Sequence, residues 1–295
     1  MTSEMKGKYC LITGASSGIG KEIALGLAEK GASVVLVCRD RARGKAAQDY
    51  IREKSGNDLV DLLIADLSSQ RQIRNLAKEY EGAYPKLHIL VNNAGTGQDK
   101  RVLTEDGVEM TFAVNYLAYF LLTNLLSGIL KRSAPSRIVN IVSQIHRVLR
   151  LDLDNLQGEK IFSRDISYAQ SKLADILFTY ELARRLEGTG VTANCVCPGA
   201  VATQLWKTSS KFLDAVFKVC MKGPVEGAGL PLYLCTSTEL EGVSCKYFQT
   251  RQHLKFSNVS VRNTMKESSR ETYDLELARQ LWEVSEKLTG LAASP

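Results

Sequence analysis

The amino-acid sequence predicts an α/β protein built on a single doubly wound, Rossmann-type parallel sheet with helices on both faces. Two observations support this fold class. Short, nearly continuous apolar segments alternate with helix-like segments, which is typical of parallel strands that helices cover on both sides. The first apolar segment leads directly into a glycine-rich turn, Thr-Gly-Ala-Ser-Ser-Gly-Ile-Gly at residues 13–20, which opens the first helix. Glycines at such a turn let the backbone approach a dinucleotide pyrophosphate.

The individual elements follow from these patterns in chain order. Strands are predicted where apolar and β-branched residues run together, at residues 9–12, 33–38, 59–64, 87–91, 138–142 and 191–196. Helices are predicted at about 19–30, 41–54, 68–80 and 110–130, and through Tyr168 to about residue 186. Pro198-Gly199 ends the sixth strand, a late insertion follows near 200–225, and an extra helix is expected at the C-terminus.

The domain organisation is predicted to be simple. No linker, internal repeat or low-complexity tract divides the 295 residues, and 44% of them are hydrophobic, enough for a large core. We therefore expect a single dinucleotide-binding domain over residues 1–295. Its cofactor half would span about 7–142, its catalytic and substrate half about 143–250, and a C-terminal extension about 251–295.

Composition and charge exclude several other classes of protein. The net charge is +6, without a long basic run or interleaved aromatic and basic residues, so nucleic-acid binding is not expected. The number of cysteines is odd, seven, and most lie in apolar segments, which indicates reduced thiols. Cys195-Val-Cys197 lacks the spacing of a zinc site, and no metal is predicted. No signal peptide opens the sequence, so we expect a cytoplasmic protein.

One uncharged stretch, residues 110–130, is long enough to cross a bilayer. It contains polar residues that would be costly in lipid, among them Asn115 and Asn124. A buried helix of a layered fold explains this stretch better.

Tyr168 and Lys172 are the first candidate catalytic pair. Four residues separate them, so on a helix they lie on one face, one turn apart. An ammonium group one turn away favours the phenolate, and it should lower the tyrosine pKa from about 10 toward neutrality. The tyrosine could then donate or accept a proton. A lone Tyr-x-x-x-Lys is more often an ordinary surface helix, so the pair needs partners elsewhere in the chain.

Asn115 and Ser143 supply such partners. An asparagine in the middle of the uncharged helix lowers helix propensity and needs hydrogen bonds if it is buried. Ser143 follows the fifth strand, at the carboxyl edge where ligands of these sheets bind. Each residue alone is common; together with Tyr168 and Lys172 they form a set suited to proton transfer.

The end of the second strand predicts which dinucleotide binds. An acidic residue there binds a ribose 2′-hydroxyl, whereas an arginine accommodates a 2′-phosphate. Arg39, with Arg41, Arg43 and Lys21 nearby, favours NADP(H), although Asp40 leaves some ambiguity and a solvated basic helix start is the alternative.

Two further strand ends are candidates for cofactor contacts. Asp66, after the third strand, could bind the adenine or cap the helix beginning at Ser68. Asn92-Asn93-Ala94-Gly95 ends the fourth strand and could line the ribose side of the cofactor, or it could be a plain turn.

These motifs together resemble the short-chain dehydrogenase/reductase superfamily over about residues 7–250. The resemblance lies in the Thr-Gly-x-x-x-Gly-x-Gly turn, the Asn-Asn-Ala-Gly segment, Pro198-Gly199, and Asn115, Ser143, Tyr168 and Lys172 in the order of that family. The chain is most similar to the retinol dehydrogenase-like branch. That similarity rests on Val37-Cys38-Arg39-Asp40, Asp154-Asn155-Leu156, residues 186–191 and Leu281-Trp282-Glu283-Val284-Ser285. Two departures from this branch are expected. Its members often carry an N-terminal membrane helix, for which no counterpart is expected here, and they often have two serines where this chain has Ser143-Gln144.

The resemblance implies a role for each residue of the set. Ser143 would hold the substrate oxygen, and Tyr168 would pass its proton. Lys172 would bind the nicotinamide ribose and lower the pKa of Tyr168, while Asn115 would order a water that links Lys172 to solvent. Contacts with the cofactor are implied for Gly14, Ser16, Ser17, Gly18, Ile19, Gly20, Arg39, Asp66, Leu67, Asn93, Ala94, Gly95, Tyr168, Lys172, Pro198, Gly199 and Thr203.

The expected function is therefore an NADP(H)-dependent oxidoreductase that interconverts a carbonyl and an alcohol on an apolar substrate, such as a retinoid, a steroid, a lipid aldehyde or another hydrophobic ketone. Two alternatives stay open. One is a double-bond or pigment reductase on the same scaffold, and the other is a non-enzymatic protein that senses a nucleotide or binds a partner. A homodimer is also left open.

The segment 205–222 carries a separate expectation. If it is helical, Lys207, Lys211, Lys218 and Lys222 form a stripe, and apolar residues including Trp206 and Phe217 cover much of the rest. Such a helix could close over the substrate as a lid, or it could bind weakly to the surface of an anionic membrane.

Overall fold

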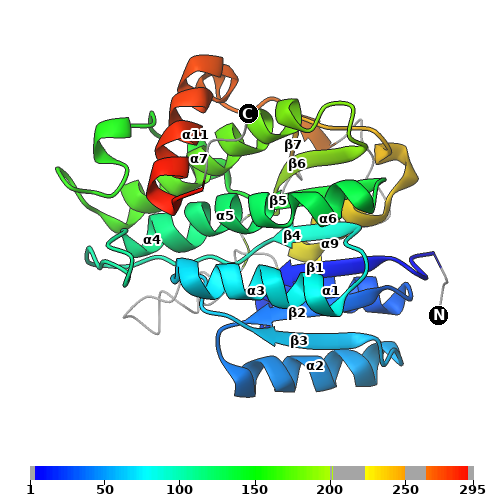
Figure 1. The fold of residues 1–295 in the computed structure, drawn as a ribbon. Helices are drawn as coiled ribbons and strands as arrows, with labels where there is room; N and C mark the ends of the chain where they lie inside the picture. The colour runs from blue at the N-terminus through cyan, green and yellow to red at the C-terminus, as the bar shows by residue number, and fades with distance from the viewer. Residues whose placement is uncertain (1–3, 200, 202–222, 250–263, 292–295) are drawn as a thin grey trace.

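The computed structural model describes residues 4–199, 201, 223–249 and 264–291, and Figure 1 shows the chain they form. Eight strands form one sheet in the order β3-β2-β1-β4-β5-β6-β7-β8. All neighbours pair in parallel except β7 and β8, which are antiparallel. The strands are β1 (Tyr9–Thr13), β2 (Ser33–Cys38), β3 (Val60–Ile64), β4 (Ile89–Asn92), β5 (Ser136–Ile141), β6 (Val191–Cys197), β7 (Lys246–Gln249) and β8 (Met265–Lys266).

Helices cover both faces of this sheet (Figure 1). The α-helices are α1 (Gly18–Glu29), α2 (Arg41–Ser55), α3 (Gln70–Ala83), α4 (Met110–Phe112), α5 (Ala118–Leu125), α6 (Ser127–Arg132), α7 (Arg164–Arg185), α9 (Pro224–Thr236) and α11 (Leu275–Thr289). A π-helical turn, η1 (Ala113–Leu117), joins α4 to α5. Short 3₁₀ turns are η2 (Gln144–Arg147), η3 (Leu153–Asn155), η5 (Thr238–Leu240) and η7 (Arg270–Tyr273).

The alternation of side chains along β1 explains the two cores. Leu11 points into the core on the face covered by α3, α5, α7 and α11, whereas Cys10 and Ile12 point into the core covered by α1, α2 and α9. All three side chains are fully buried. Because strands of this kind are apolar on both faces, their sequence reads as continuous rather than alternating hydrophobicity. The predicted doubly wound fold is confirmed.

The structure also corrects the prediction at one edge of the sheet. The sequence predicted six strands, and the two that follow α9, β7 and β8, were missed. The strand β7 has four residues, and β8 has only two, both exposed. Segments this short, without an apolar run, carry no periodic signal.

The uncharged stretch forms α4, η1, α5 and most of α6, so it is interrupted rather than one regular helix. Most of its side chains are buried against the sheet and α7, as expected. Across the described ranges, no helix combines the length and the apolar composition needed to cross a membrane. The six cysteines that the structure describes are all free thiols.

The predicted C-terminal helix is present as α11, and it packs on α7. Trp282 contacts Phe120 of α5 edge-on, with ring centroids 4.9 Å apart, and Phe178 of α7 at 5.8 Å. Arg185 lies over the indole, 4.1 Å from the ring centroid. The C-terminal helix therefore completes the core beneath the helix that carries Tyr168.

Candidate active site

The glycine-rich turn lies where the strand order reverses, between β1 and α1. Gly14 and Gly18 have φ of +67° and +60°, values that favour glycine. A Cβ on Gly14 would lie 2.8 Å from the Cα of Ala94, and a Cβ on Gly20 would lie 2.4 Å from the Nδ2 of Asn93. Glycine is required here because the turn packs directly on the end of β4.

The helix α1 begins at this turn with an N-terminus that is open to an anion. Its N-cap residue, Ser17, makes no side-chain cap hydrogen bond. The first backbone N–H groups of a helix favour a phosphate, because they lack partners within the helix. The predicted residues Ser16, Ser17 and Ile19 all lie in this turn, partly exposed. The turn therefore fits a pyrophosphate.

Asn93 and Ala94 fix the end of β4 to the end of β1. The Nδ2 of Asn93 donates to the carbonyl oxygen of Thr13 at 2.9 Å. The backbone N–H groups of Asn93 and Ala94 both donate to the Oγ1 of Thr13, at 2.9 and 3.1 Å. These bonds shape the turn, and the side-chain amide of Asn93 is used in them as a donor to the backbone.

The end of β2 carries Arg39, which is exposed and has no carboxylate within ion-pair distance in the described part of the chain. Asp40 is the N-cap of α2, and its Oδ1 accepts a 2.8 Å hydrogen bond from the N–H of Arg43. The guanidinium of Arg43 reaches the Oγ of Ser17 at 3.4 Å. Asp40 is therefore engaged as a helix cap, Arg43 contacts the glycine-rich turn, and Arg39 follows the strand next to it. Lys21 instead lies over the ring of Tyr50, 4.0 Å from its centroid.

Asp66 does not cap a helix at Ser68, which corrects one sequence interpretation. Its Oδ1 accepts hydrogen bonds from the backbone N–H and the hydroxyl of Ser68, at 2.9 and 2.8 Å. The next helix, α3, begins later, and its N-cap is Ser69. The carboxylate of Asp66 therefore stabilises the turn between β3 and α3, while Leu67 beside it is buried in the core.

Asn115 lies in the π-helical turn η1 and is completely buried. Its Oδ1 accepts from the backbone N–H of Thr96 at 2.7 Å. Its Nδ2 donates to the carbonyl oxygen of Thr96 and to the Oγ of Ser171, both at 3.0 Å. The side chain thus joins the segment after Gly95 to α7. Extra-wide turns of this kind are frequent at functional sites, and no residue pattern in the sequence marked it.

Ser143 follows β5 and is the N-cap of η2. Its hydroxyl hydrogen-bonds the Tyr168 hydroxyl, and this contact joins two of the predicted catalytic residues. The Nδ1 of His146 lies 2.7 Å from the carbonyl oxygen of Ser143, and its Nε2 accepts from the N–H of Ser269 at 3.3 Å. His146, which no sequence pattern indicated, therefore links the backbone of Ser143 to that of Ser269.

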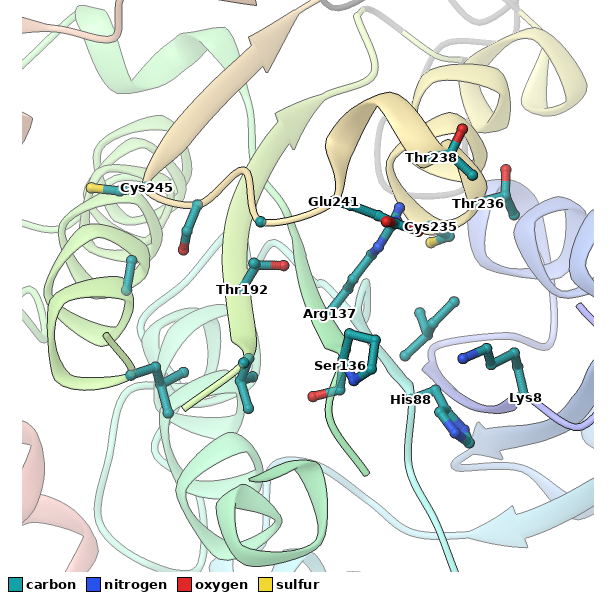
Figure 2. Close-up of a pocket in the computed structure, with 18 of the residues that line it drawn as sticks. Lys8, His88, Ser136, Arg137, Thr192, Cys235, Thr236, Thr238, Glu241 and Cys245 are labelled. Carbon is teal, nitrogen blue, oxygen red and sulfur yellow. The ribbon is translucent and has the colours of Figure 1, made fainter. Parts of the chain in front are cut away.

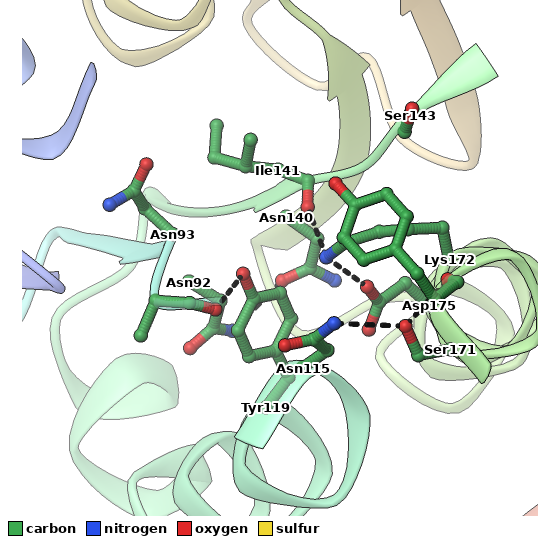
Figure 3. A network of polar contacts seen from close by, with 12 residues as sticks. Asn92, Asn93, Asn115, Tyr119, Asn140, Ile141, Ser143, Ser171, Lys172 and Asp175 are labelled. Atoms are coloured by element: carbon green, nitrogen blue, oxygen red, sulfur yellow. Dashed lines mark hydrogen bonds and ion pairs between the residues drawn. The ribbon is translucent and has the colours of Figure 1, made fainter. Parts of the chain in front are cut away.

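The helix α7 places Tyr168 and Lys172 on one face, as predicted. Its N-terminus is held by Ser163, which caps it, and by the Oγ of Ser167, which donates to the buried carboxylate of Glu109 at 2.9 Å. The Nζ of Lys172 donates to the carbonyl oxygen of Ile141 at 3.0 Å. Figure 3 shows this ammonium group between β5 and α7, at the carboxyl edge of the sheet.

The pKa of Tyr168 is raised above its ordinary value, contrary to the sequence-based expectation. Burial is the main cause, and the charges of Cys197 and Asp175 add to it, whereas the hydrogen bond with Ser143 acts in the opposite direction. Lys172 does not offset this, because its ammonium is paired with the Oδ2 of Asp175 at 2.8 Å. Asp175 was not predicted as part of the site; a lone Asp three residues beyond Lys172 gave no recognisable signal.

Of the remaining predicted residues, Pro198 and Gly199 follow β6, and Gly199 has a φ of +90°. Thr203 and the whole segment 205–222 lie outside the described residues. Among the residues that are described, no cluster of three or more His, Cys, Asp or Glu side chains could hold a metal ion.

A separate cavity of about 680 Å³ lies at the opposite end of the strands, where β4, β5 and β6 begin (Figure 2). Ile89, Ser136 and Val191, at the starts of β4, β5 and β6, line it together with Arg137. Neither Tyr168 nor the residues it contacts line this cavity. Since ligands of doubly wound sheets bind beyond the carboxyl ends of the strands, this cavity is not the candidate active site.

Comparisons with known proteins agree with this geometry. A model of the family described as short chain dehydrogenase matches residues 8–214. Retinol dehydrogenase 11 from Mus musculus is 43% identical over 290 residues, which cover 98% of this chain and 88% of that protein. Retinol dehydrogenase 14 from Homo sapiens is 40% identical over 306 residues, covering 97% and 88%.

Solved structures also resemble this chain in fold. A crystal structure of an uncharacterized protein from Mycobacterium Paratuberculosis has a TM-score of 0.75 at 30% identity, covering 97% of this chain and 94% of that one. A structure described as an NAD(P) dependent gluconate 5-dehydrogenase from Beutenbergia cavernae, with NADP bound at low occupancy, has a TM-score of 0.67 at 25% identity. It covers 83% of this chain and 95% of its own.

Proposed function

Because this chain belongs to the short-chain dehydrogenase family, we propose that it is an NADP(H)-dependent oxidoreductase that interconverts a carbonyl and an alcohol on an apolar substrate. The observation that carries the proposal is the meeting of Ser143, Tyr168 and Lys172 at the carboxyl edge of the sheet. The hydroxyls of Ser143 and Tyr168 are hydrogen-bonded, and Lys172 lies one turn further along the same helix.

The proposed mechanism assigns one task to each side chain. Bound NADPH would supply the hydride for the carbonyl carbon. The Ser143 hydroxyl donates a hydrogen bond to the carbonyl oxygen and positions it, and Tyr168 transfers its phenolic proton to that oxygen as charge develops there. Lys172 would bind the nicotinamide ribose. In oxidation the same proton returns to Tyr168, which then acts as the base.

Asn115 has a positioning role in this proposal. Its amide bonds to Thr96 and Ser171 hold the segment after Gly95 against α7. This arrangement keeps the ribose side of the cofactor site close to the residues that transfer the proton. The water that the family resemblance assigns to Asn115 would be bound near the same turn.

The preference for NADP(H) is proposed from the charges at the end of β2. Arg39 is exposed and unpaired by any described carboxylate, whereas its neighbour in the sequence, Asp40, is engaged as the cap of α2. A guanidinium group can bind a 2′-phosphate through two parallel hydrogen bonds. The NADP named for the gluconate 5-dehydrogenase structure is consistent with this choice.

Replacement of Arg39 tests this preference. Arg39→Asp would place a carboxylate against the 2′-phosphate, so we expect the ratio of kcat/KM for NADPH to that for NADH to fall by at least tenfold, about 1.4 kcal/mol. Lys78→Asp, an equal charge change at an exposed position on α3, is the control and should leave the ratio unchanged. Equal use of both cofactors by the wild type would contradict the proposal.

The proposed substrates are apolar, with retinoids first, because several of the relatives are named retinol dehydrogenases. The decisive assay is NADPH consumption with all-trans-retinal, steroid ketones, lipid aldehydes and simple ketones, in the dark. Turnover of a carbonyl would exclude a reductase that needs light or a pigment. Reduction of a conjugated double bond with the carbonyl retained would favour the first alternative, and NADPH binding without any turnover would favour a nucleotide sensor.

We also propose that the segment 205–222 brings the protein to membrane surfaces, so that an apolar substrate enters without crossing water. The support is the sequence pattern of four lysines at helical spacing among Trp, Phe, Leu and Val residues. Each lysine near an anionic surface contributes about 1 kcal/mol, and salt weakens the attraction. We expect co-sedimentation with anionic but not neutral liposomes, lost when all four lysines are replaced by glutamate. Equal binding by both proteins would contradict the membrane proposal, and the interpretation of this segment as a lid over the substrate would remain.

A further inference from the structure

Asp175 is a buried carboxylate beside Lys172, and the mechanism proposed above gives it no task. Its exposed fraction is 0%, and its Oδ2 lies 2.8 Å from the Nζ of Lys172. Its other oxygen, Oδ1, is also buried and has no hydrogen-bond partner in the described part of the chain. A buried carboxylate with an unpartnered oxygen lowers stability. Packing alone therefore does not explain why this residue is an acid.

The titratable groups around Asp175 are one cation and several weak acids, and Figure 3 shows the cation, Lys172, hydrogen-bonded to it. The titratable groups that face it are Lys172 and Tyr168 from its own helix, Tyr116 from η1, Tyr119 from α5 and Cys195 from β6. A negative charge on Asp175 opposes ionisation of each of these acids. Tyr168 is the one among them that the proposed mechanism uses.

The positive charge of Lys172 can act on two groups, the carboxylate of Asp175 and the phenolate of Tyr168. Its side chain is buried, with the ammonium bonded to the Ile141 carbonyl and to Asp175, 5.1 Å from the centre of the Tyr119 ring. When the carboxylate is ionised, the pair is neutral overall, and the lysine gives little net electrostatic help to a Tyr168 phenolate. When the carboxyl is neutral, the full positive charge acts on that phenolate.

We propose that Asp175 is a positioning residue that sets the proton affinity of Tyr168 by controlling how much of the charge of Lys172 reaches it. The proposal rests on the oxidoreductase function proposed above. Ionised Asp175 keeps Tyr168 protonated to higher pH and so favours proton donation, that is, reduction. When Asp175 is neutral, Tyr168 loses its proton at lower pH. This favours the phenolate, which is the base that oxidation requires.

Asp175 gains or loses its charge near neutral pH, so its effect on Tyr168 changes there. Burial raises the pKa of its carboxyl to about 7, with Lys172 acting in the opposite direction. The charge on Asp175 therefore changes in the range in which cells operate. Above that range the carboxylate is ionised, and there an uncharged replacement should differ most from the wild type.

The test is the pH dependence of kcat/KM for reduction of all-trans-retinal by saturating NADPH. Asp175→Asn keeps the size and an oxygen for Lys172 but removes the charge. We expect its alkaline limb, where Tyr168 loses its proton, to lie about one pH unit or more below that of the wild type. Asp165→Asn, an exposed position on the same helix, is the control and should not move the limb. Coincident limbs for wild type and Asp175→Asn would overturn the proposal.

A second measurement does not depend on turnover. The Cζ NMR signal of ¹³C-labelled tyrosine, assigned to Tyr168 by its absence in Tyr168→Phe, should titrate at lower pH in Asp175→Asn than in the wild type. If the wild type turned over no carbonyl of the panel, the oxidoreductase function would fail, and this titration would still decide the role of Asp175. An unchanged titration overturns it. Asp175→Ser replaces Asp175→Asn in both measurements if the asparagine variant does not fold.

Discussion

At the scale of single residues, the site depends on side chains outside the proposed catalytic set. Ser143 is placed by the buried ring of His146, which contacts the Ser143 carbonyl and the N–H of Ser269. The sequence suggested Ser143 because it ends an apolar strand. It did not suggest His146 or Asp175, because their importance comes from partners more than a hundred residues away or from burial, and neither appears in a local pattern.

The ring of His146 makes stability sensitive to acid. Burial lowers its pKa to about 4; the hydrogen bond to the Ser143 carbonyl opposes this, and the charge of Arg147 adds to it. The neutral ring accepts the N–H of Ser269 through Nε2. The folded pKa is below the unfolded value, so this stabilisation is present above about pH 6.5 and is lost as the pH falls toward 4. The pKa of His88 is lowered to about 4 by burial as well, and its Nδ1 accepts from the N–H of Tyr9.

We therefore expect acidification from pH 7 to about pH 4 to lower the free energy of unfolding by roughly 3 kcal/mol through His146 alone. Urea unfolding at both pH values checks this. His146→Gln cannot gain a charge, so it should lose that much less on acidification than the wild type. Equal losses in the two proteins would mean that His146 does not titrate as the structure indicates.

At the scale of elements, contacts between strand ends decide which residues the glycine-rich turn accepts. Gly14 adopts a left-handed φ, and a Cβ added to it would lie 2.8 Å from the Cα of Ala94. The sequence predicted this turn, since glycine spacing after a strand is a local pattern. It did not predict the π-turn at Asn115, because the same residues would also suit a regular buried helix.

Comparing Gly14→Ala with Gly107→Ala distinguishes the cost of backbone strain from the cost of the contact with Ala94. Gly107 has a similar φ of +75°, but nothing lies within 4 Å of where its Cβ would be. We expect Gly107→Ala to lower stability by about 1–2 kcal/mol from backbone strain alone. Gly14→Ala should cost more, and it should also weaken NADPH binding, because β1 and β4 must move apart. Thermal unfolding and NADPH titration measure both effects; equal destabilisation would show that the contact with Ala94 is unimportant.

At the scale of the whole molecule, the alternating pattern of apolar segments and helices was sufficient to predict the doubly wound sheet. Each of the six predicted strands is long enough, and apolar enough, to be recognised without its neighbours. The packing of α11 could not be predicted, because Trp282 meets Phe120 and Phe178 only after the chain has folded. Charge pairing such as that of Lys172 with Asp175 also depends on burial, which the sequence alone does not give.

The central claim is that Tyr168 gives its proton to a carbonyl that NADPH reduces, and single-turnover reduction by the Tyr168→Phe variant tests it most directly. Phenylalanine keeps the ring and its packing but has no proton to give. With the best carbonyl of the panel, we expect the rate to fall by roughly 10²–10⁴-fold, with NADPH affinity little changed. A rate close to that of the wild type, with NADPH still bound, would contradict the claim.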